Sequence, residues 1–264
     1  MSRSLFLAAA EALRCSEIDQ KLALTTAVEI EWLAGELDWQ DPSRVDLICG
    51  IPEKPELIPP KAVPQRSPVT TEGRARLLHA IVHIEFSAIN LALDHAARFR
   101  DMPERYYADW VGVAAEEAYH FRILRDRLRS LGHDYGDFPA HAGLWEMAER
   151  TAHDILARMA LVPRLLEARG LDATPPIQRK LEQAGDHESA RLLDIILHDE
   201  IGHVGLGDRW FRQLCEARHL EPESTYRDLL RQFKAPRPIL PMNETARLAA
   251  GFSSAELAAL SEKV

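Results

Sequence analysis

Apolar residues recur at intervals of three and four along most of the chain, which is the spacing of one face of an α-helix. This periodicity predicts four long helices, at about 71–100, 103–131, 140–170 and 177–218. Alternating apolar and polar runs with hairpin turns, the signal of β-strands, are nearly absent. The pattern therefore predicts an all-α chain built around an antiparallel four-helix bundle.

The predicted helix boundaries come from residues that disfavour helix. Asp, Met and Pro at 101–103 separate the first two helices, and a glycine-rich stretch at 132–136 separates the second from the third. Residues 170–176, which begin with glycine and end with two prolines, are predicted to separate the third helix from the fourth. Gly and Asp at 185–186 are a further candidate interruption within the fourth helix.

Additional segments flank the predicted bundle. One or two amphipathic helices are expected before residue 38, and six prolines then exclude helix from the next stretch. Short helices are expected after Asn243 and Ser253. The sequence thus predicts an N-terminal helical extension, a proline-rich arm, the bundle and a C-terminal extension that packs on it, at 1–50, 51–70, 71–218 and 219–264.

Acidic and histidine side chains interrupt the apolar stripes of three of these helices. Glu85 lies on the first stripe, Glu117 and His120 on the second, and Glu200 and His203 on the fourth. A buried carboxylate without a counter-charge is costly, so such positions require a cationic partner. A metal ion supplies that charge, although buried ion pairs without a metal remain an alternative interpretation.

The second and fourth helices each carry a Glu-x-x-His motif, at 117–120 and 200–203. Three-residue spacing places a carboxylate and an imidazole side by side on one helix face. A two-metal site in a four-helix bundle also takes one glutamate from each of the other two helices. Glu85 is the candidate on the first helix and Glu167 on the third, with Glu146 or Glu149 as replacements for Glu167.

The spacing of these glutamates suggests two similar helix hairpins. Glu85 precedes Glu117 by 32 residues, and Glu167 precedes Glu200 by 33. The midpoint of the first pair coincides with the turn predicted at 101–103. The midpoint of the second pair falls near residue 183, between the two sets of helix-breaking residues, so this spacing does not by itself select Glu167.

Four carboxylates and two imidazoles form an oxygen-rich donor set that favours iron or manganese over thiolate-selected metals. We therefore expect two iron ions, or alternatively manganese or a mixed iron–manganese pair. Glu116 and Asp199, which immediately precede the motif glutamates, are candidates to hydrogen-bond the outer nitrogens of the ligand histidines. Tyr119 lies inside the first motif and is a candidate for proton or electron transfer, with simple packing as the preferred interpretation.

The ligand pattern resembles that of the ferritin-like di-iron carboxylate superfamily. Three segments, HIEFSAINLALD (83–94), RMALVPRLLEARGLD (158–172) and HDEIGHV (198–204), resemble more narrowly a bacterial family catalogued as domain of unknown function 455. This resemblance extends over nearly the whole chain. It implies a ferritin-like bundle with a dinuclear metal site, and it implies no particular substrate.

The resulting functional hypothesis is an oxidoreductase that activates dioxygen or peroxide on an unknown small-molecule substrate. An external electron donor is then required, because the chain has neither a flavin fingerprint nor a cysteine set for an iron–sulfur cluster. Two alternatives stay open. One is a ferroxidase or metal-handling protein without an organic substrate, and the other is an RNA-modifying enzyme similar to the di-iron hydroxylase of a tRNA nucleoside.

Composition and net charge narrow the classes of partner that the chain could bind. The 41 acidic and 32 basic residues give a net charge of -9, which disfavours nucleic acid as a partner. Assigning four of the acids to internal ligands weakens that argument. The sequence has no apolar run of the length that a membrane span requires and no convincing signal peptide, so we expect a cytoplasmic protein that does not bind membranes. A homodimer is one assembly compatible with these features.

Overall fold

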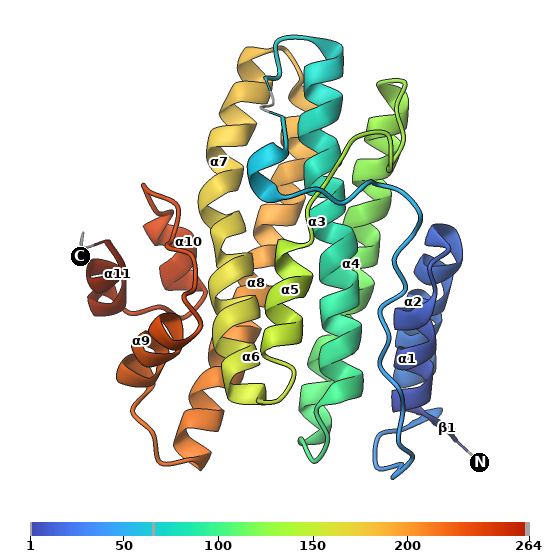
Figure 1. Ribbon diagram of the computed structural model, residues 1–264, viewed down its shortest axis with the longest axis vertical. Coiled ribbons are helices and arrows are strands. Elements are labelled where there is room, and N and C mark those ends of the chain that lie inside the picture. Colours follow the sequence, from blue (N-terminus) through green and yellow to red (C-terminus); the bar gives the residue numbers. More distant parts are fainter. Residues whose placement is uncertain (1, 65–66, 262–264) are drawn as a thin grey trace. The chain divides into compact units, whose positions relative to one another are not determined.

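The computed structural model describes residues 2–64 and 67–261 and divides the chain into two compact units, Met1–Trp145 and Glu146–Val264 (Figure 1). Helices dominate both units, which confirms the all-α class. Within the described residues, β1 (Arg3–Ser4) and β2 (Leu37–Asp38) form a short parallel pair in which Arg3 lies opposite Leu37. The pairing of four helices in one bundle stays a prediction.

The first unit is built around two long antiparallel helices, α3 and α4, which pack along their length (Figure 1). Helix α1 packs on α3, and α2 packs on both α1 and α4. The helical elements of this unit are α1 (Leu5–Arg14), α2 (Ile18–Leu33), the 3₁₀ turn η1 (Pro60–Ala62), α3 (Thr71–Arg98) and α4 (Glu104–Ser130). Helix α5 (Gly143–Arg150) crosses the boundary between the units.

Local chemistry explains the ends of α3 and α4. The hydroxyl of Thr70 accepts a hydrogen bond from the backbone N–H of Gly73 (3.0 Å) and so caps the start of α3. Between the helices Asp101 adopts a positive φ of 61°, and Pro103 precedes the first residue of α4. The predicted turn at 101–103 is confirmed, and two helices, α1 and α2, lie before residue 38, where one or two were expected.

Helix α3 is long and apolar enough to cross a membrane by length and composition alone. Two thirds of its most apolar window is buried inside the protein (67%). Its apolar side chains pack against α1 and α4. The hydropathy of α3 is therefore explained by internal packing, and cytoplasmic localisation stays a prediction.

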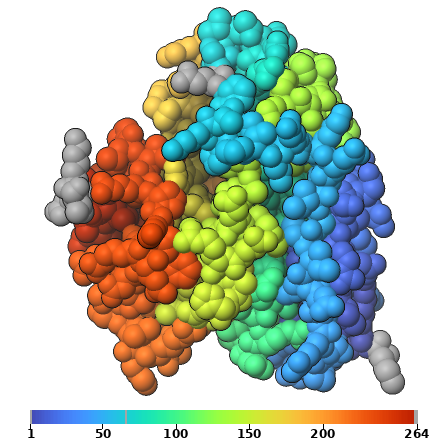
Figure 2. Space-filling model, viewed as in Figure 1, coloured from blue at the N-terminus to red at the C-terminus, as the bar shows by residue number. Residues whose placement is uncertain are grey.

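Residues 39–64, between β2 and α3, are irregular apart from η1, and Figure 2 shows this segment in lighter blue on the surface of the first unit. The backbone N–H of Ile58 donates to the carbonyl of Ala140 (2.8 Å), and the N–H of Ala140 donates to the carbonyl of Glu56 (2.9 Å). These bonds fasten the proline-rich arm to the loop that follows α4. Residues 65–66 of the arm lie outside the described residues.

The second unit contains a helical hairpin of α7 and α8, with shorter elements packed on α8. Gly185, with a φ of +77°, lies in the turn between the two helices, and Asp186 caps α8 through a bond from the N–H of Ser189 (3.1 Å). Its elements are α6 (Ile155–Leu161), the π-helical segment η2 (Val162–Glu167), α7 (Ala168–Gln183), α8 (His187–Ala217), α9 (Pro222–Gln232), α10 (Glu244–Ala249) and α11 (Ser254–Ser261).

Two predicted boundaries in this unit were wrong. The expected third helix at 140–170 is interrupted at 151–154 and by η2, and the expected break at 170–176 lies inside α7. Leu171 and Leu181, on either side of the two prolines, are fully buried, so packing overrides the local preference against helix. The turn falls instead at 184–186, next to the midpoint of Glu167 and Glu200. Helices α10 and α11 begin where they were expected, whereas α9 was missed.

Candidate metal centre

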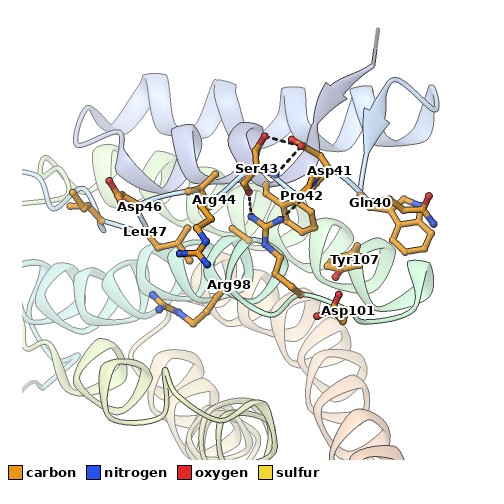
Figure 3. Close-up of a pocket in the computed structure, with 16 residues that line it drawn as sticks. Gln40, Asp41, Pro42, Ser43, Arg44, Asp46, Leu47, Arg98, Asp101 and Tyr107 are labelled. Carbon is orange, nitrogen blue, oxygen red and sulfur yellow. Dashed lines mark hydrogen bonds between the residues drawn. The ribbon is translucent and has the colours of Figure 1, made fainter.

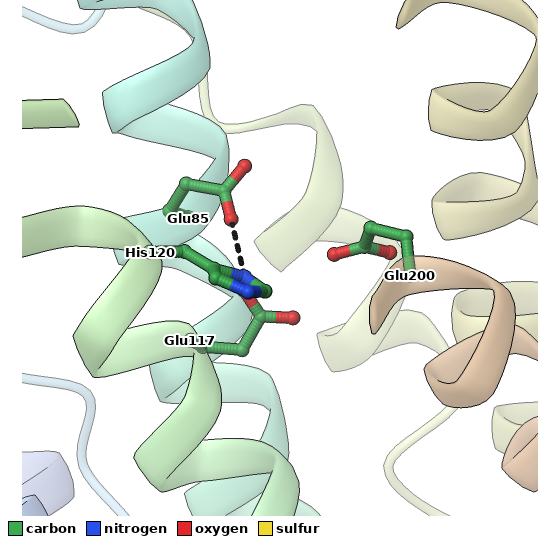
Figure 4. A group of neighbouring side chains, drawn as sticks. All are labelled: Glu85, Glu117, His120 and Glu200. Carbon is green, nitrogen blue, oxygen red and sulfur yellow. Dashed lines mark ion pairs between the residues drawn. The ribbon is translucent and has the colours of Figure 1, made fainter. Parts of the chain in front are cut away.

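Glu85 on α3 and the first Glu-x-x-His motif on α4 form a buried cluster in the first unit. Nδ1 of His120 lies 3.4 Å from Oε2 of Glu85 and 3.5 Å from Oε2 of Glu117. One ligand atom from each of the three side chains lies within 4.8 Å of the others. Figure 4 shows the three side chains pointing toward one another, with the ion pair between Glu85 and His120 dashed.

The cluster is almost completely removed from solvent, since Glu85, Glu117 and His120 are 3%, 1% and 0% exposed. Burial, reinforced by the negative charge of Glu117, raises the pKa of Glu85 to about 7. Burial by itself lowers the pKa of His120, but the contacts with Glu117 and Glu85 outweigh it and raise that pKa to about 11. The carboxylates of Glu85 and Glu117 thus both contact the imidazole of His120 in a low-dielectric environment.

This donor set fits a divalent cation. Two carboxylates and an imidazole converge on one point from two helices, and they combine the oxygen and nitrogen donors that iron and manganese accept. Oε2 of Glu85 is buried, and its contact with Nδ1 of His120, at 3.4 Å, is too long for a good hydrogen bond, so this oxygen can accept a closer cation. The cation would also remove the repulsion that raises the pKa of Glu85.

The second Glu-x-x-His motif, in the second unit, places a glutamate beside a histidine on one helix in the same way. On α8, Oε1 of Glu200 lies 3.5 Å from Nδ1 of His203, almost the same separation as between Glu117 and His120. His203 is buried at 1% exposure, and the Glu200 side chain is 14% exposed. Glu200 is the fourth residue drawn in Figure 4, where it extends from α8. The i, i+3 spacing therefore presents both groups on one face, as predicted.

Glu167, the proposed lone glutamate of the second unit, is the last residue of the π-helical segment η2. Its side chain is partly buried, and its Oε2 atom is shielded from solvent. The alternatives Glu146 and Glu149 both lie on α5 with exposed side chains. Burial therefore favours Glu167 among the three, and its assignment as a ligand stays a prediction.

A close contact holds η2 against α8. A Cβ atom at Gly207 would lie 2.5 Å from Cβ and 2.7 Å from Cγ of Pro163, so only glycine permits this approach. Gly202 has no atom within 4 Å of that position, and Gly205 has only ordinary contacts. Of the three glycines, Gly207 alone is required for close packing here. It lies seven residues after Glu200, two turns along the same helix.

A buried charge network, which sequence analysis missed, also fixes η2. Nε of Arg164 lies 2.6 Å from Oδ1 of Asp208, and its Nη2 pairs with Glu256 of α11. Arg212 binds the other carboxylate oxygen of each acid, at 2.8 Å from Asp208 and 2.9 Å from Glu256. The only sequence signal was the i, i+4 spacing of Asp208 and Arg212, because the contacts of Arg164 join distant segments.

The residues predicted to support the ligands have different environments. Glu116 is exposed on α4, whereas Asp199 is partly buried on α8. Tyr119 is 45% exposed, and its ring centroid lies 6.1 Å from that of His120. The roles of Glu116, Asp199 and Tyr119 beside a metal stay predictions, and the burial of Asp199 makes it the best placed of the three.

Comparison with known proteins assigns the family. The chain belongs to the family described as "Protein of unknown function (DUF455)", which matches residues 14–258 and confirms the family resemblance. It is also 51% identical over 219 residues to an uncharacterized protein of Haemophilus influenzae, a match that covers 80% of this chain and 76% of that protein. No solved structure matches the chain.

Proposed function

We propose that the chain is a dinuclear metal protein of the ferritin-like kind. Its two hairpins, α3–α4 and α7–α8, would pair as a four-helix bundle and share one centre. Glu85, Glu117 and His120 would be the ligands from the first hairpin. The ligands from the second hairpin would be Glu167, Glu200 and His203.

The buried Glu85–Glu117–His120 cluster carries this proposal. The two buried carboxylates share only the imidazole of His120, and the pKa of Glu85 stays raised by burial and by Glu117, so a bound cation would offset a repulsion that His120 leaves in place. The recurrence of Glu-x-x-His at the same atomic separation in the second unit supports a second, equivalent half of the site. Paired hairpins of this kind are the known route to a two-metal site in a helical bundle.

The proposed activity is an oxidoreductase reaction in which dioxygen or peroxide oxidises a small substrate. A pair of iron or manganese ions supplies the redox chemistry for such a reaction when bound. The four glutamates would hold the ions and offset their charge, and the two histidines would complete the donor set. The apolar residues around Glu85 and His120 exclude water, which strengthens the electrostatic hold on a cation.

Oxygen consumption by the full-length protein, loaded anaerobically with ferrous iron, tests this function. With ascorbate as the reductant, an oxidoreductase is expected to consume dioxygen well beyond the amount that the bound iron can reduce, after subtraction of the consumption by ascorbate alone and by ascorbate with free iron. Consumption that stops once the bound iron is oxidised would contradict the oxidoreductase proposal.

The matched control for this experiment compares two glutamates of α4. Glu117→Ala removes a proposed ligand, whereas Glu104→Ala removes an exposed carboxylate at the start of the same helix. We expect Glu117→Ala to abolish oxygen consumption above background and Glu104→Ala to retain it. Equal rates in both variants would overturn the assignment of the centre.

A further inference from the structure

A large pocket lies at one end of the first unit, away from the Glu85 cluster. Its volume is about 1050 Å³, and it opens between the segment 39–48 and the adjoining ends of α3 and α4 (Figure 3). Arg98, on the α3 side of this pocket, follows Glu85 by 13 residues, or about 20 Å along the helix. The pocket is therefore distinct from the proposed metal centre.

The outer wall of the pocket is held in place by arginines. Arg100 donates to the backbone carbonyls of Asp41 (3.0 Å) and Ser43 (2.8 Å), and its guanidinium lies over the ring of Phe6 at 3.4 Å. Arg14 donates to the carbonyl of Asp46 (2.9 Å). These bonds fix an otherwise irregular segment, so the cavity is formed before any ligand binds.

Two further arginines line this cavity from its two sides. Figure 3 shows Arg44 extending from the outer segment toward α3, and Arg98 extending along the end of α3 with its guanidinium on the side of Arg44. Arg98 is bound on one side by the buried carboxylate of Asp94, with Nη2 2.7 Å from Oδ1. Arg44 is exposed and makes no ion pair or hydrogen bond within residues 2–64 and 67–261. Arg44 therefore supplies a positive charge that no acid among the described residues compensates, and Arg98, already paired with Asp94, supplies further guanidinium donors for an anion.

The acids that line the pocket do not occupy the space between these two guanidinium groups. Asp41 is engaged locally, since its Oδ1 accepts from the N–H (2.9 Å) and the hydroxyl (2.8 Å) of Ser43. Figure 3 shows Asp46 and Asp101 on opposite sides of the view rather than between the two guanidinium groups. The carboxylates therefore leave the space between Arg44 and Arg98 available.

The ring of Trp39, which is half-buried, forms another part of the wall. It lies 5.8 Å from the ring of Tyr107 at an interplanar angle of 34°, and Tyr107, only 1% exposed, supports it from the protein side. Flat apolar surfaces of this kind bind rings, whereas arginine forks bind phosphate oxygens in pairs. We propose that this pocket binds a small organic phosphate that carries a ring, with the phosphate at Arg44 and Arg98 and the ring against Trp39.

Calorimetric titration of the full-length protein with phenyl phosphate, inorganic phosphate and benzoate tests the proposal. One phenyl phosphate per chain is expected to bind at least tenfold more tightly than inorganic phosphate or benzoate. Arg44→Ala should weaken phenyl phosphate binding about tenfold or more, because it removes a charged donor. This substitution should not disturb folding, since Arg44 is exposed and holds no other group.

Arg105→Ala is the matched control, because Arg105 is an exposed arginine at the start of α4 that does not line the pocket. It should change the affinity less than twofold. If Arg44→Ala and Arg105→Ala weaken phenyl phosphate binding equally, the effect comes only from the lost net charge, and the proposal is overturned. The absence of phenyl phosphate binding at millimolar concentration, or equal affinity for benzoate, would also overturn it.

Discussion

Oε2 of Glu85 on α3 lies 3.4 Å from Nδ1 of His120 on α4, and both side chains are buried. The hairpin brings them together because Glu85 and Glu117 are equally far from the turn. Glu85 lies 13 residues before the end of α3, and Glu117 lies 13 residues after the start of α4. Residues at equal distances from the turn of an antiparallel helix pair lie at the same height. Glu85 therefore contacts the Glu-x-x-His motif at 117–120.

The raised pKa of Glu85 predicts how the metal-free protein responds to pH. Its pKa is about 7 in the folded protein and about 4.5 in the unfolded chain, so between these values the folded state holds the extra proton. The free energy of unfolding should therefore fall as pH rises from about 4.5 to 7. His120 acts in the same direction at higher pH, because its folded pKa of about 11 exceeds its ordinary value of 6.5.

Urea unfolding in the presence of a chelator at pH 5, 6 and 7 measures this dependence. Glu85→Gln removes the titrating group and should flatten the fall in stability, whereas Glu104→Gln, an exposed substitution on α4, should leave it unchanged. A Glu85→Gln variant whose stability falls with pH as steeply as that of the wild type would contradict the assigned environment of Glu85.

The contact between Gly207 and Pro163 predicts a specific defect. Gly207→Ala places a methyl group 2.5 Å from the proline ring, and the resulting overpacking should lower the free energy of unfolding by about 1–3 kcal/mol. Gly202→Ala on the same helix is the control. It meets no atom within 4 Å and should raise stability by up to about 1 kcal/mol through helix propensity. Chemical denaturation distinguishes the two, and equal effects would refute the close approach.

The buried Arg164 network predicts a larger loss. Arg164→Met leaves the buried carboxylates of Asp208 and Glu256 with only Arg212 as a cationic partner among the described residues, and should cost about 3 kcal/mol of stability. Arg231→Met breaks an exposed pair with Asp228 and should cost less than about 1 kcal/mol. If thermal and urea unfolding show comparable losses for both variants, Arg164 does not anchor η2.

Sequence reasoning succeeded where local rules decide the structure. The i, i+3 spacing placed Glu117 beside His120, and proline and aspartate marked the turn after α3. Sequence reasoning failed where contacts between residues far apart in the sequence decide the structure. Helix α7 continues through Pro175 and Pro176 because packing on both sides buries Leu171 and Leu181.

The π-helical segment and the pocket could not be predicted for the same reason. The position of η2 depends on Gly207, 44 residues after Pro163, and on the pairing of Arg164 with Glu256. The outer wall of the pocket depends on Arg100, which binds carbonyls more than 50 residues earlier in the chain. Periodicity and motif spacing carry no information about such pairs.

The central claim is that both hairpins contribute to one dinuclear metal centre, and metal content tests it most directly. Protein purified anaerobically and reconstituted with iron or manganese should contain two metal ions per chain. Glu117→Ala and His203→Ala, one from each hairpin, should each lower this content to one ion or fewer, whereas Glu216→Ala, an exposed substitution on α8, should retain two. About one ion per chain or fewer in the wild type, or equal content in all four proteins, would contradict a dinuclear centre shared by the two hairpins.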